Sequence, residues 1–346
     1  MSRHMSAYMG NHASMPSVVT PGLRYRNLGK SGLRVPNIGL GMWTMPNEEC
    51  AEDIIMTAIE NGINLFDLSE AHSELGRILK KRNVRRTSII ITTKIYWSTK
   101  SDERGLSRKH IIESVKASLQ RLQMEYIDVV LLHKVDPVCP MEVRAMNFVI
   151  NQGWVMYWGT ARWSPSEIMD AYTNCRQFNC ITPIVEQTEY HMFCREKPEL
   201  YLPELYHKIG VGKLTILDMH TWVSESVLSI SLLFSFSDQV GVEEPRTYGD
   251  KLRDLANLAN SMNCSLSQLA VAWCLKNESV NCLLLGATSV EHFKENIHAL
   301  QIVPQLTPSV MIEIERLLAN KPQRPPMVST LAMRNQQNNS VRLDMT

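Results

Sequence analysis

Six short apolar runs in this chain each end on a polar or ionisable residue, and segments with helical spacing of apolar residues separate them. Strands that alternate with helices indicate a parallel sheet covered on both faces. When such strands repeatedly place a polar residue at the same end, those residues converge on one rim. The sequence therefore predicts an α/β fold, a (β/α)8 TIM barrel, with its site at that rim. The six runs cover residues 63–67, 88–94, 126–133, 154–162, 181–187 and 281–288.

The composition fits one large domain. The chain has 346 residues, of which 44% are hydrophobic and 21% charged, and a barrel of this type takes about 250 residues. Lys and Arg number 36 against 35 for Asp and Glu, so charge gives no case for a nucleic acid or an anionic membrane as partner. The longest apolar stretch outside the strands, residues 226–237, is far shorter than the roughly 20 residues of a membrane span. The eight cysteines form no CxxC pair and no secretory leader precedes them, so we expect reduced thiols and a cytoplasmic location.

Further elements are expected at both ends of the barrel domain, which we place at residues 23–320. A hairpin with Gly-Lys-Ser-Gly as its turn is predicted over residues 24–36, and an added surface helix over 304–320. Residues 1–22 and the Pro-, Asn- and Gln-rich residues 321–346 are expected to be flexible tails. The remaining two strands are expected near residues 37–42 and 213–218, and helices over 47–61, 73–82, 107–123, 141–152, 164–178, 199–209, 249–261, 266–277 and 290–300.

Three ionisable residues end strands that would be neighbours in the barrel. They are Asp67, Lys94 and His133, at the ends of the second, third and fourth strands. A lysine at the end of a nearly apolar strand is costly unless it is paired, and Asp67 is the nearest expected partner. The alternative is a purely structural ion pair that closes the barrel. His133 alone is equally well explained as a hydrogen-bonded core histidine.

Longer stretches of the chain resemble a known family. The order Asp, Lys, His on successive strands is similar to that of the aldo-keto reductases, which are NADP(H)-dependent barrels. Within that family the chain resembles the cytoplasmic β subunits of voltage-gated potassium channels, most closely those of insect Shaker-type channels, over residues 23–212 and 250–333. The stretches that carry this resemblance are LRYRNLGKSGLR at 23–34, ERGLSRKHIIE at 103–113, MYWGTARWS at 156–164 and EYHMFCREK at 189–197.

The resemblance implies an auxiliary subunit as the first reading of function. Such a protein is a homo-tetramer that docks on the cytoplasmic tetramerisation domain of a Shaker-type channel α subunit, modulates its gating and can report NADP(H) redox state. It reaches the plasma membrane only through the channel. The alternative is an active NADPH-dependent reductase of aldehydes or ketones. A third reading, a barrel hydrolase that pairs Asp67 with Glu186 or Glu189, explains Lys94 poorly because the lysine would neutralise the pair.

The resemblance also predicts the catalytic residues as Asp67, His72, Lys94 and His133. In the family a tyrosine held by the Lys–Asp pair donates a proton to a carbonyl, and the nearby lysine lowers the pKa of that tyrosine. Here the family's Asp-x-x-x-x-Tyr reads DLSEAH at residues 67–72, so a histidine replaces the tyrosine. We therefore expect slow or absent turnover, with a solvated loop residue as the alternative role for His72. His133 could orient a carbonyl or the nicotinamide amide.

The cofactor implied by the resemblance is NADPH, and no metal site is expected. Gln187 would contact the nicotinamide carboxamide, and Glu295 and Asn296 the adenine end. The free N–H groups at the start of the helix after the eighth strand suit a phosphate. The alternative for Glu295 and Asn296 is an ordinary helix surface. The family positions that hold the cofactor fall on Trp43, Asp67, His133, Arg162, Gln187, Gly286, Thr288, His292, Glu295 and Asn296.

Two segments depart from the family pattern. The loop after the first strand, residues 41–48, is short and lacks the family's threonine after Gly41 and a downstream glutamine. Residues 215–247 lack the family's Trp-Ser-Pro-Leu and the basic loop that clamps the pyrophosphate. Losing that clamp predicts weaker retention of NADPH. An alternative exon or a faulty gene model would also explain the segment.

Overall fold

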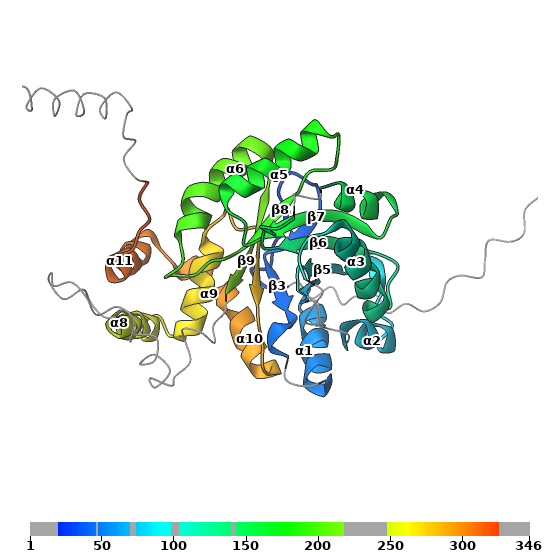
Figure 1. Ribbon diagram of the computed structural model, residues 1–346. Coiled ribbons are helices and arrows are strands. Elements are labelled where there is room, and N and C mark those ends of the chain that lie inside the picture. The colour runs from blue at the N-terminus through cyan, green and yellow to red at the C-terminus, as the bar shows by residue number, and fades with distance from the viewer. Residues whose placement is uncertain are drawn as a thin grey trace, which may run out of the picture.

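The computed structural model describes residues 20–45, 48–69, 74–97, 104–139, 143–217 and 248–324. Eight parallel strands close into a barrel in the order β10-β3-β4-β5-β6-β7-β8-β9, with helices around the outside (Figure 1). The predicted (β/α)8 barrel is therefore confirmed. The strands are β3 Ile38–Gly41, β4 Leu65–Asp67, β5 Ile90–Ile95, β6 Ile127–His133, β7 Val155–Ala161, β8 Val185–Glu189, β9 Gly212–Leu217 and β10 Cys282–Leu285.

The helices lie where the apolar spacing predicts them, within one to four residues at each end. Ser107 and Ser164 act as the expected N-caps, because their hydroxyls accept hydrogen bonds from the backbone N–H of His110 and Glu167. Ser265 caps the following helix in the same way. The helices are α1 Glu48–Glu60, α2 Glu74–Lys81, α3 Arg108–Leu122, α4 Val143–Asn151, α5 Pro165–Gln177, α6 Leu202–Ile209, α8 Tyr248–Ser261, α9 Leu266–Lys276, α10 Val290–His298 and α11 Pro308–Leu318.

The N-terminal hairpin covers the end of the barrel at which the strands begin. Its strands β1 Tyr25–Asn27 and β2 Arg34–Pro36 pair antiparallel, as predicted. Leu28 is fully buried in the cluster that fills the barrel interior. At Gly29, where φ is +58°, an added Cβ would lie 2.4 Å from the carbonyl oxygen of Gly210, so only glycine fits this turn. The hairpin leaves the opposite end, where the strands finish, as the rim available for a site.

Three predicted boundaries are wrong, for local reasons. The fifth run, residues 181–187, starts as a strand only at Val185, because Pro183 has no N–H to give to a ladder. A π-helical turn, η3 Lys197–Tyr201, precedes α6. The last helix starts at Pro308 rather than at 304, because Thr307 supplies its N-cap.

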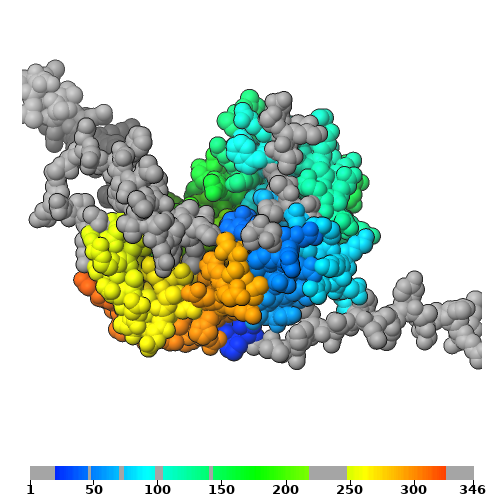
Figure 2. All heavy atoms as spheres, turned by 90° about the horizontal axis from the view of Figure 1, so that it is seen from below, coloured from blue at the N-terminus to red at the C-terminus, as the bar shows by residue number. Residues whose placement is uncertain are grey.

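Helices from opposite ends of the chain meet where the barrel closes. On the face shown in Figure 2, α1 (blue) and α10 (orange) lie side by side, and the two helices pack against each other. This contact flanks the pairing of β10 with β3. It therefore places the N-terminal half of α10 beside the loop that follows β3. Among the described residues, no helix is both long enough and apolar enough to cross a bilayer.

Candidate functional site

The Asp67 carboxylate at the end of β4 is the centre of the rim. It is fully buried, and the ammonium group of Lys94 lies 2.5 Å from its Oδ2 atom. The Thr92 hydroxyl and the Gln187 amide donate to its Oδ1 atom, at 2.5 and 3.1 Å. A buried carboxylate without such partners would be strongly destabilising. The expected pairing of Asp67 with Lys94 is present, and Gln187 joins the same cluster.

Strand geometry brings these side chains together. Thr92 and Lys94 are two residues apart on β5, so both point into the barrel. Asp67 pairs in register with Thr92, which sets the carboxylate beside the hydroxyl. Gln187 reaches the same carboxylate from β8, 120 residues further along the chain. Sequence reasoning assigned Gln187 to the cofactor and did not single out Thr92, because a threonine within an apolar strand is an ordinary strand residue.

His133 and Arg162 stand beside this cluster. His133 ends β6, and its ring makes no hydrogen bond to any part of the chain that the structure describes. Burial, then the charges of Lys94 and Arg162, lower the pKa of His133 to about 4. The imidazole is therefore neutral near pH 7, able to donate or accept a hydrogen bond. Arg162 is exposed and has a positive φ of +63°. Its backbone N–H donates to the carbonyl oxygen of Gln187 at 3.0 Å.

This depressed pKa predicts a pH dependence of stability. Between about pH 6.5 and 4 the unfolded chain binds a proton at His133 that the folded chain does not, so acidification favours unfolding. Between pH 7 and 4.5 the free energy of unfolding of His133→Asn should fall by about 2 kcal/mol less than that of the wild type. This value is reduced because the His133 side chain is partly exposed. Denaturant unfolding at both pH values measures it. Equal losses in both proteins would contradict the assignment.

The loop after β3 folds over the end of β10. The Trp43 ring lies against Gly41, where an added Cβ would be 1.8 Å from the ring. A Cβ at Gly286 would lie 2.9 Å from the Thr44 hydroxyl and 3.2 Å from Trp43 Nε1. Thr44 also donates to the carbonyl of Ala287 at 3.1 Å. Trp43 and Gly286, both predicted cofactor positions, are therefore adjacent, and Thr44 is a contact that the sequence did not indicate.

Helix α10 and the residues just before it carry the remaining predicted cofactor residues. Ser289 caps its start by accepting the N–H of His292, and Thr288 lies 3.4 Å from the His292 ring nitrogen. The exposed Glu295 carboxylate accepts a hydrogen bond from Ser265, at 2.7 Å. That contact fits the alternative of an ordinary helix surface for Glu295.

Asn296 behaves differently from its neighbour Glu295. Its side chain is fully buried, and neither its amide nitrogen nor its amide oxygen has a hydrogen-bond partner among the described residues. An unsatisfied buried polar group costs about 1–3 kcal/mol. A ligand group that offers one donor and one acceptor side by side, such as the edge of adenine, would satisfy both atoms. The residues present therefore fit the adenine end of the implied cofactor.

Two expectations fall on residues outside the described ranges. His72, the predicted substitute for the proton-donating tyrosine, lies in the gap between residues 69 and 74. Most of the segment that departs from the family pattern, residues 218–247, lies outside as well. Its first residues, 215–217, complete β9.

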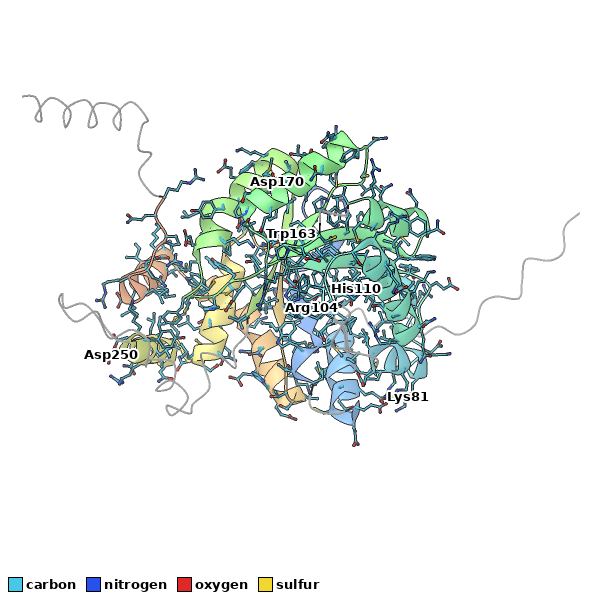
Figure 3. The ribbon with its side chains drawn as sticks, in the orientation of Figure 1. Lys81, Arg104, His110, Trp163, Asp170 and Asp250 are labelled. Atoms are coloured by element: carbon cyan, nitrogen blue, oxygen red, sulfur yellow. The ribbon has the colours of Figure 1, made fainter. Side chains whose placement is uncertain are left out.

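Glu186 does not pair with Asp67 as the hydrolase reading requires. Alternation along β8 turns Glu186 away from the barrel interior, toward the Thr160 hydroxyl, the Trp163 backbone N–H and the Lys197 ammonium group. Figure 3 shows Trp163 lying inward of α5, whereas Asp170 on α5 points away from the barrel. These neighbours satisfy Glu186 as a structural group, so it does not supply the second carboxylate of the hydrolase reading. Glu189, the other carboxylate of that reading, lies 3.0 Å from the His191 ring nitrogen Nε2.

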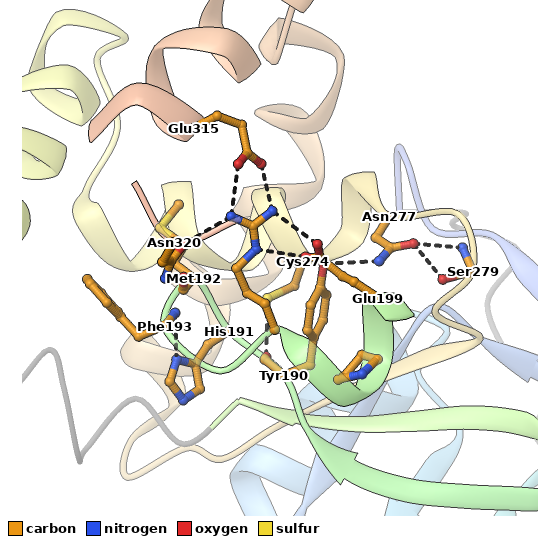
Figure 4. A network of polar contacts seen from close by, with 12 residues as sticks. Tyr190, His191, Met192, Phe193, Glu199, Cys274, Asn277, Ser279, Glu315 and Asn320 are labelled. Atoms are coloured by element: carbon orange, nitrogen blue, oxygen red, sulfur yellow. Dashed lines mark hydrogen bonds and ion pairs between the residues drawn. The ribbon is translucent and has the colours of Figure 1, made fainter. Parts of the chain in front are cut away.

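Sequence reasoning missed a network around Arg195, drawn in Figure 4. This buried guanidinium donates to Glu199 at 2.9 Å, to Glu315 at 2.7 Å and to the Asn320 side chain at 3.0 Å. The network ties the segment that follows β8 to α11. The i,i+4 spacing of Arg195 and Glu199 was an available signal. Nothing in the sequence indicated Glu315, 120 residues away.

Comparison with protein families gives a match over most of the chain. The family model described as Aldo/keto reductase family matches residues 37–319. This range runs from the residue before β3 to the residue after α11, and so contains every strand of the barrel.

Proposed function

The chain belongs to the aldo/keto reductase family, and we propose that it binds NADP(H) at the barrel rim and serves as an auxiliary subunit of a Shaker-type voltage-gated potassium channel. In this proposal it is a cytoplasmic homo-tetramer that docks on the tetramerisation domain of the channel α subunit. It reaches the plasma membrane only through that channel. Carbonyl reduction is weak or lost, because His72 occupies the position of the family's tyrosine.

The observation that carries the cofactor part is the unpartnered amide of Asn296. A fully buried side chain with both polar atoms unsatisfied is rare in a stable fold. It is explained when a ligand completes it. The channel part rests on the resemblance of residues 23–34, 103–113, 156–164 and 189–197 to channel β subunits.

The rim residues have distinct proposed roles. NADPH, when bound, supplies a hydride. Asn296 and the start of α10 hold its adenine and phosphate end, and Arg162 and Gln187 border its nicotinamide end. Asp67 fixes the ammonium group of Lys94 at 2.5 Å, so that group stays oriented at the rim. Neutral His133 donates a hydrogen bond to a carbonyl oxygen without competing for the proton.

Replacing Asn296 with leucine should have opposite effects on stability and on cofactor binding. Leucine removes the unsatisfied buried amide at similar volume, so we expect the cofactor-free protein to gain about 1 kcal/mol in unfolding free energy. We expect NADPH affinity to fall at least about tenfold, since one good hydrogen bond is worth about 1.4 kcal/mol. Denaturant unfolding and quenching of cofactor fluorescence measure the two effects. Unchanged NADPH affinity would remove Asn296 from the site.

The channel role is tested by co-purification. The full chain, co-expressed with the cytoplasmic tetramerisation domain of a Shaker-type channel, should elute with it as a complex of four plus four chains. Currents of the intact channel should change on co-expression. Separate elution together with unaltered currents would defeat the proposal, whatever the result of the NADPH titration.

The second candidate is an active reductase. Its support is that the buried Asp67–Lys94 pair and a neutral His133 are both in place. An inactive protein would have no catalytic need for these groups. Steady-state reduction of a reactive aldehyde by the wild-type chain decides between the two. Turnover above about 1 per second, within the usual range for enzymes, would favour the reductase.

A further inference from the structure

Three metal-binding side chains converge directly after β8. Glu189, His191 and Cys194 each offer one ligand atom, and these atoms all lie within 4.8 Å of one another. Glu189 is the last residue of β8, two positions after the predicted cofactor residue Gln187, and His191 and Cys194 follow it. Neither the proposed cofactor site nor the Arg195 network uses them as ligands.

Backbone geometry explains the convergence. His191 and Cys194 form a hydrogen-bonded antiparallel bridge, with the His191 N–H on the Cys194 carbonyl at 3.3 Å and the reverse bond at 3.0 Å. Residues directly opposite each other in such a bridge project their side chains to the same face. Glu189 precedes His191 by two residues along an extended chain, which also puts it on that face. The three groups are thus fixed by main-chain bonds rather than by chance rotamers.

The donor set matches a thiophilic divalent cation. A thiolate, an imidazole and a carboxylate are the ligands that zinc takes. Tetrahedral zinc holds neighbouring ligand atoms roughly 3.3–3.7 Å apart, from bond lengths of about 2.0–2.3 Å. His191 Nε2 and Glu189 Oε1 are already 3.0 Å apart. Small side-chain shifts therefore suffice, and three protein ligands leave a fourth position open.

The surroundings allow an ion to enter and leave. The Glu189 side chain is 49% exposed, whereas that of His191 is 10% exposed. In the metal-free chain the imidazole also accepts the Phe193 N–H at Nδ1, a contact visible in Figure 4. A ring bound through Nε2 carries its proton on Nδ1 and gives up that bond. Ligation through Nε2 also replaces the hydrogen bond between that atom and Glu189 Oε1 at 3.0 Å, and three bonds to a cation form in return.

Binding must release protons. Burial, and then the Glu189 carboxylate, raise the pKa of the Cys194 thiol, while Lys197 opposes them. The thiol is therefore protonated near pH 7 and must lose its proton to ligate a cation. The Lys197 ammonium group is bonded to the Glu186 carboxylate at 2.5 Å, so it is engaged with a different carboxylate from Glu189. Metal affinity should consequently rise with pH.

We infer that Glu189, His191 and Cys194 form a binding site for one divalent cation of the Zn2+ class, a site that the sequence analysis did not anticipate. A bound ion would fasten the turn at residues 191–194 to the end of β8, next to Gln187.

The test titrates the full chain with Zn2+ against a chromophoric chelator, in the presence and absence of NADPH. We expect about one equivalent to bind, and Cys194→Ser or His191→Gln to weaken binding at least about tenfold. Cys180→Ser, at another half-buried cysteine on the loop after α5, is the matched control and should bind as the wild type does. Absence of stoichiometric binding, or equal affinity in Cys194→Ser, would overturn the inference.

Cobalt gives a spectroscopic readout in the wild-type chain itself. Co2+ added to the wild-type chain should produce the charge-transfer absorption of a thiolate–cobalt bond. This band should vanish in Cys194→Ser and persist in Cys180→Ser. A wild-type spectrum without the band, or a band that Cys180→Ser abolishes, would show that Cys194 is not a ligand.

Discussion

Replacing Lys94 with methionine is expected to lower the free energy of unfolding by about 3–5 kcal/mol. The change removes the cation 2.5 Å from Asp67 and leaves a fully buried carboxylate whose remaining donors among the described residues are the neutral groups of Thr92 and Gln187. Methionine fills most of the lysine's volume, so the loss reports charge rather than a cavity. Denaturant unfolding at pH 7 measures it. Residual aldehyde reduction should disappear in the same variant.

The matched control is the double variant Asp67→Asn with Lys94→Met. It removes both charges together, and replacing a buried ion pair by neutral groups is often close to neutral for stability. We expect it to recover at least half of the stability lost in Lys94→Met. If instead the single variant is as stable as the wild type, Asp67 is not the buried charge that the geometry shows. A double variant no better than the single would place the loss in packing.

The barrel could be predicted from the sequence because the same pattern of residues is repeated along the chain. Six short apolar runs each end on a polar residue, and helices between them carry Ser caps such as Ser107 and Ser164. Errors arose where one residue overrides the pattern, as Pro183 does before β8. The hairpin was predictable from its Gly-Lys-Ser-Gly turn. At the end of the barrel where the strands begin, the hairpin turn lies close to Gly210 through Gly29, a contact that sequence spacing does not reveal.

The contacts at the rim could be predicted only in part from the sequence, for a physical reason. Alternation along strands places Asp67 and Lys94 together whatever the rest of the chain does. Contacts between distant elements depend on how loops fold, and a single sequence carries no mark of them. The bond from Gln187 to Asp67 and the approach of Thr44 to Gly286 are of this kind.

The unsatisfied state of Asn296 is also invisible in a sequence. Its position on α10 predicts only that one helix face is buried. Whether its amide finds a partner depends on every neighbour of α10 at once. The resemblance assigns Glu295 and Asn296 the same role, but their side chains differ in the structure. Glu295 accepts a hydrogen bond from Ser265, whereas the Asn296 amide has no hydrogen-bond partner among the described residues.

Restoring a tyrosine at position 72 should raise carbonyl reduction by about 100-fold or more in kcat/KM. A positioned general acid is typically worth 10² to 10⁴ in rate. Lys94 is held by Asp67 at the rim, and a nearby ammonium group lowers the pKa of a phenol while it raises the cost of protonating an imidazole. His72→Tyr therefore gains a competent acid where the present histidine is disfavoured as one. Steady-state reduction of a reactive aldehyde with NADPH measures the change.

Two control variants test whether the effect of His72→Tyr comes from proton donation. His72→Phe supplies the same ring without the hydroxyl and should leave the rate unchanged, so a gain in both variants would point to packing rather than proton donation. His72→Tyr combined with Lys94→Met should lose the gain, because the phenol then lacks the ammonium group that lowers its pKa. A wild-type rate in His72→Tyr, with NADPH still bound, would mean that residue 72 does not reach the substrate. The alignment of residues 67–72 with the family's Asp-x-x-x-x-Tyr would then be wrong, although the buried Asp67–Lys94 pair would stand unchanged.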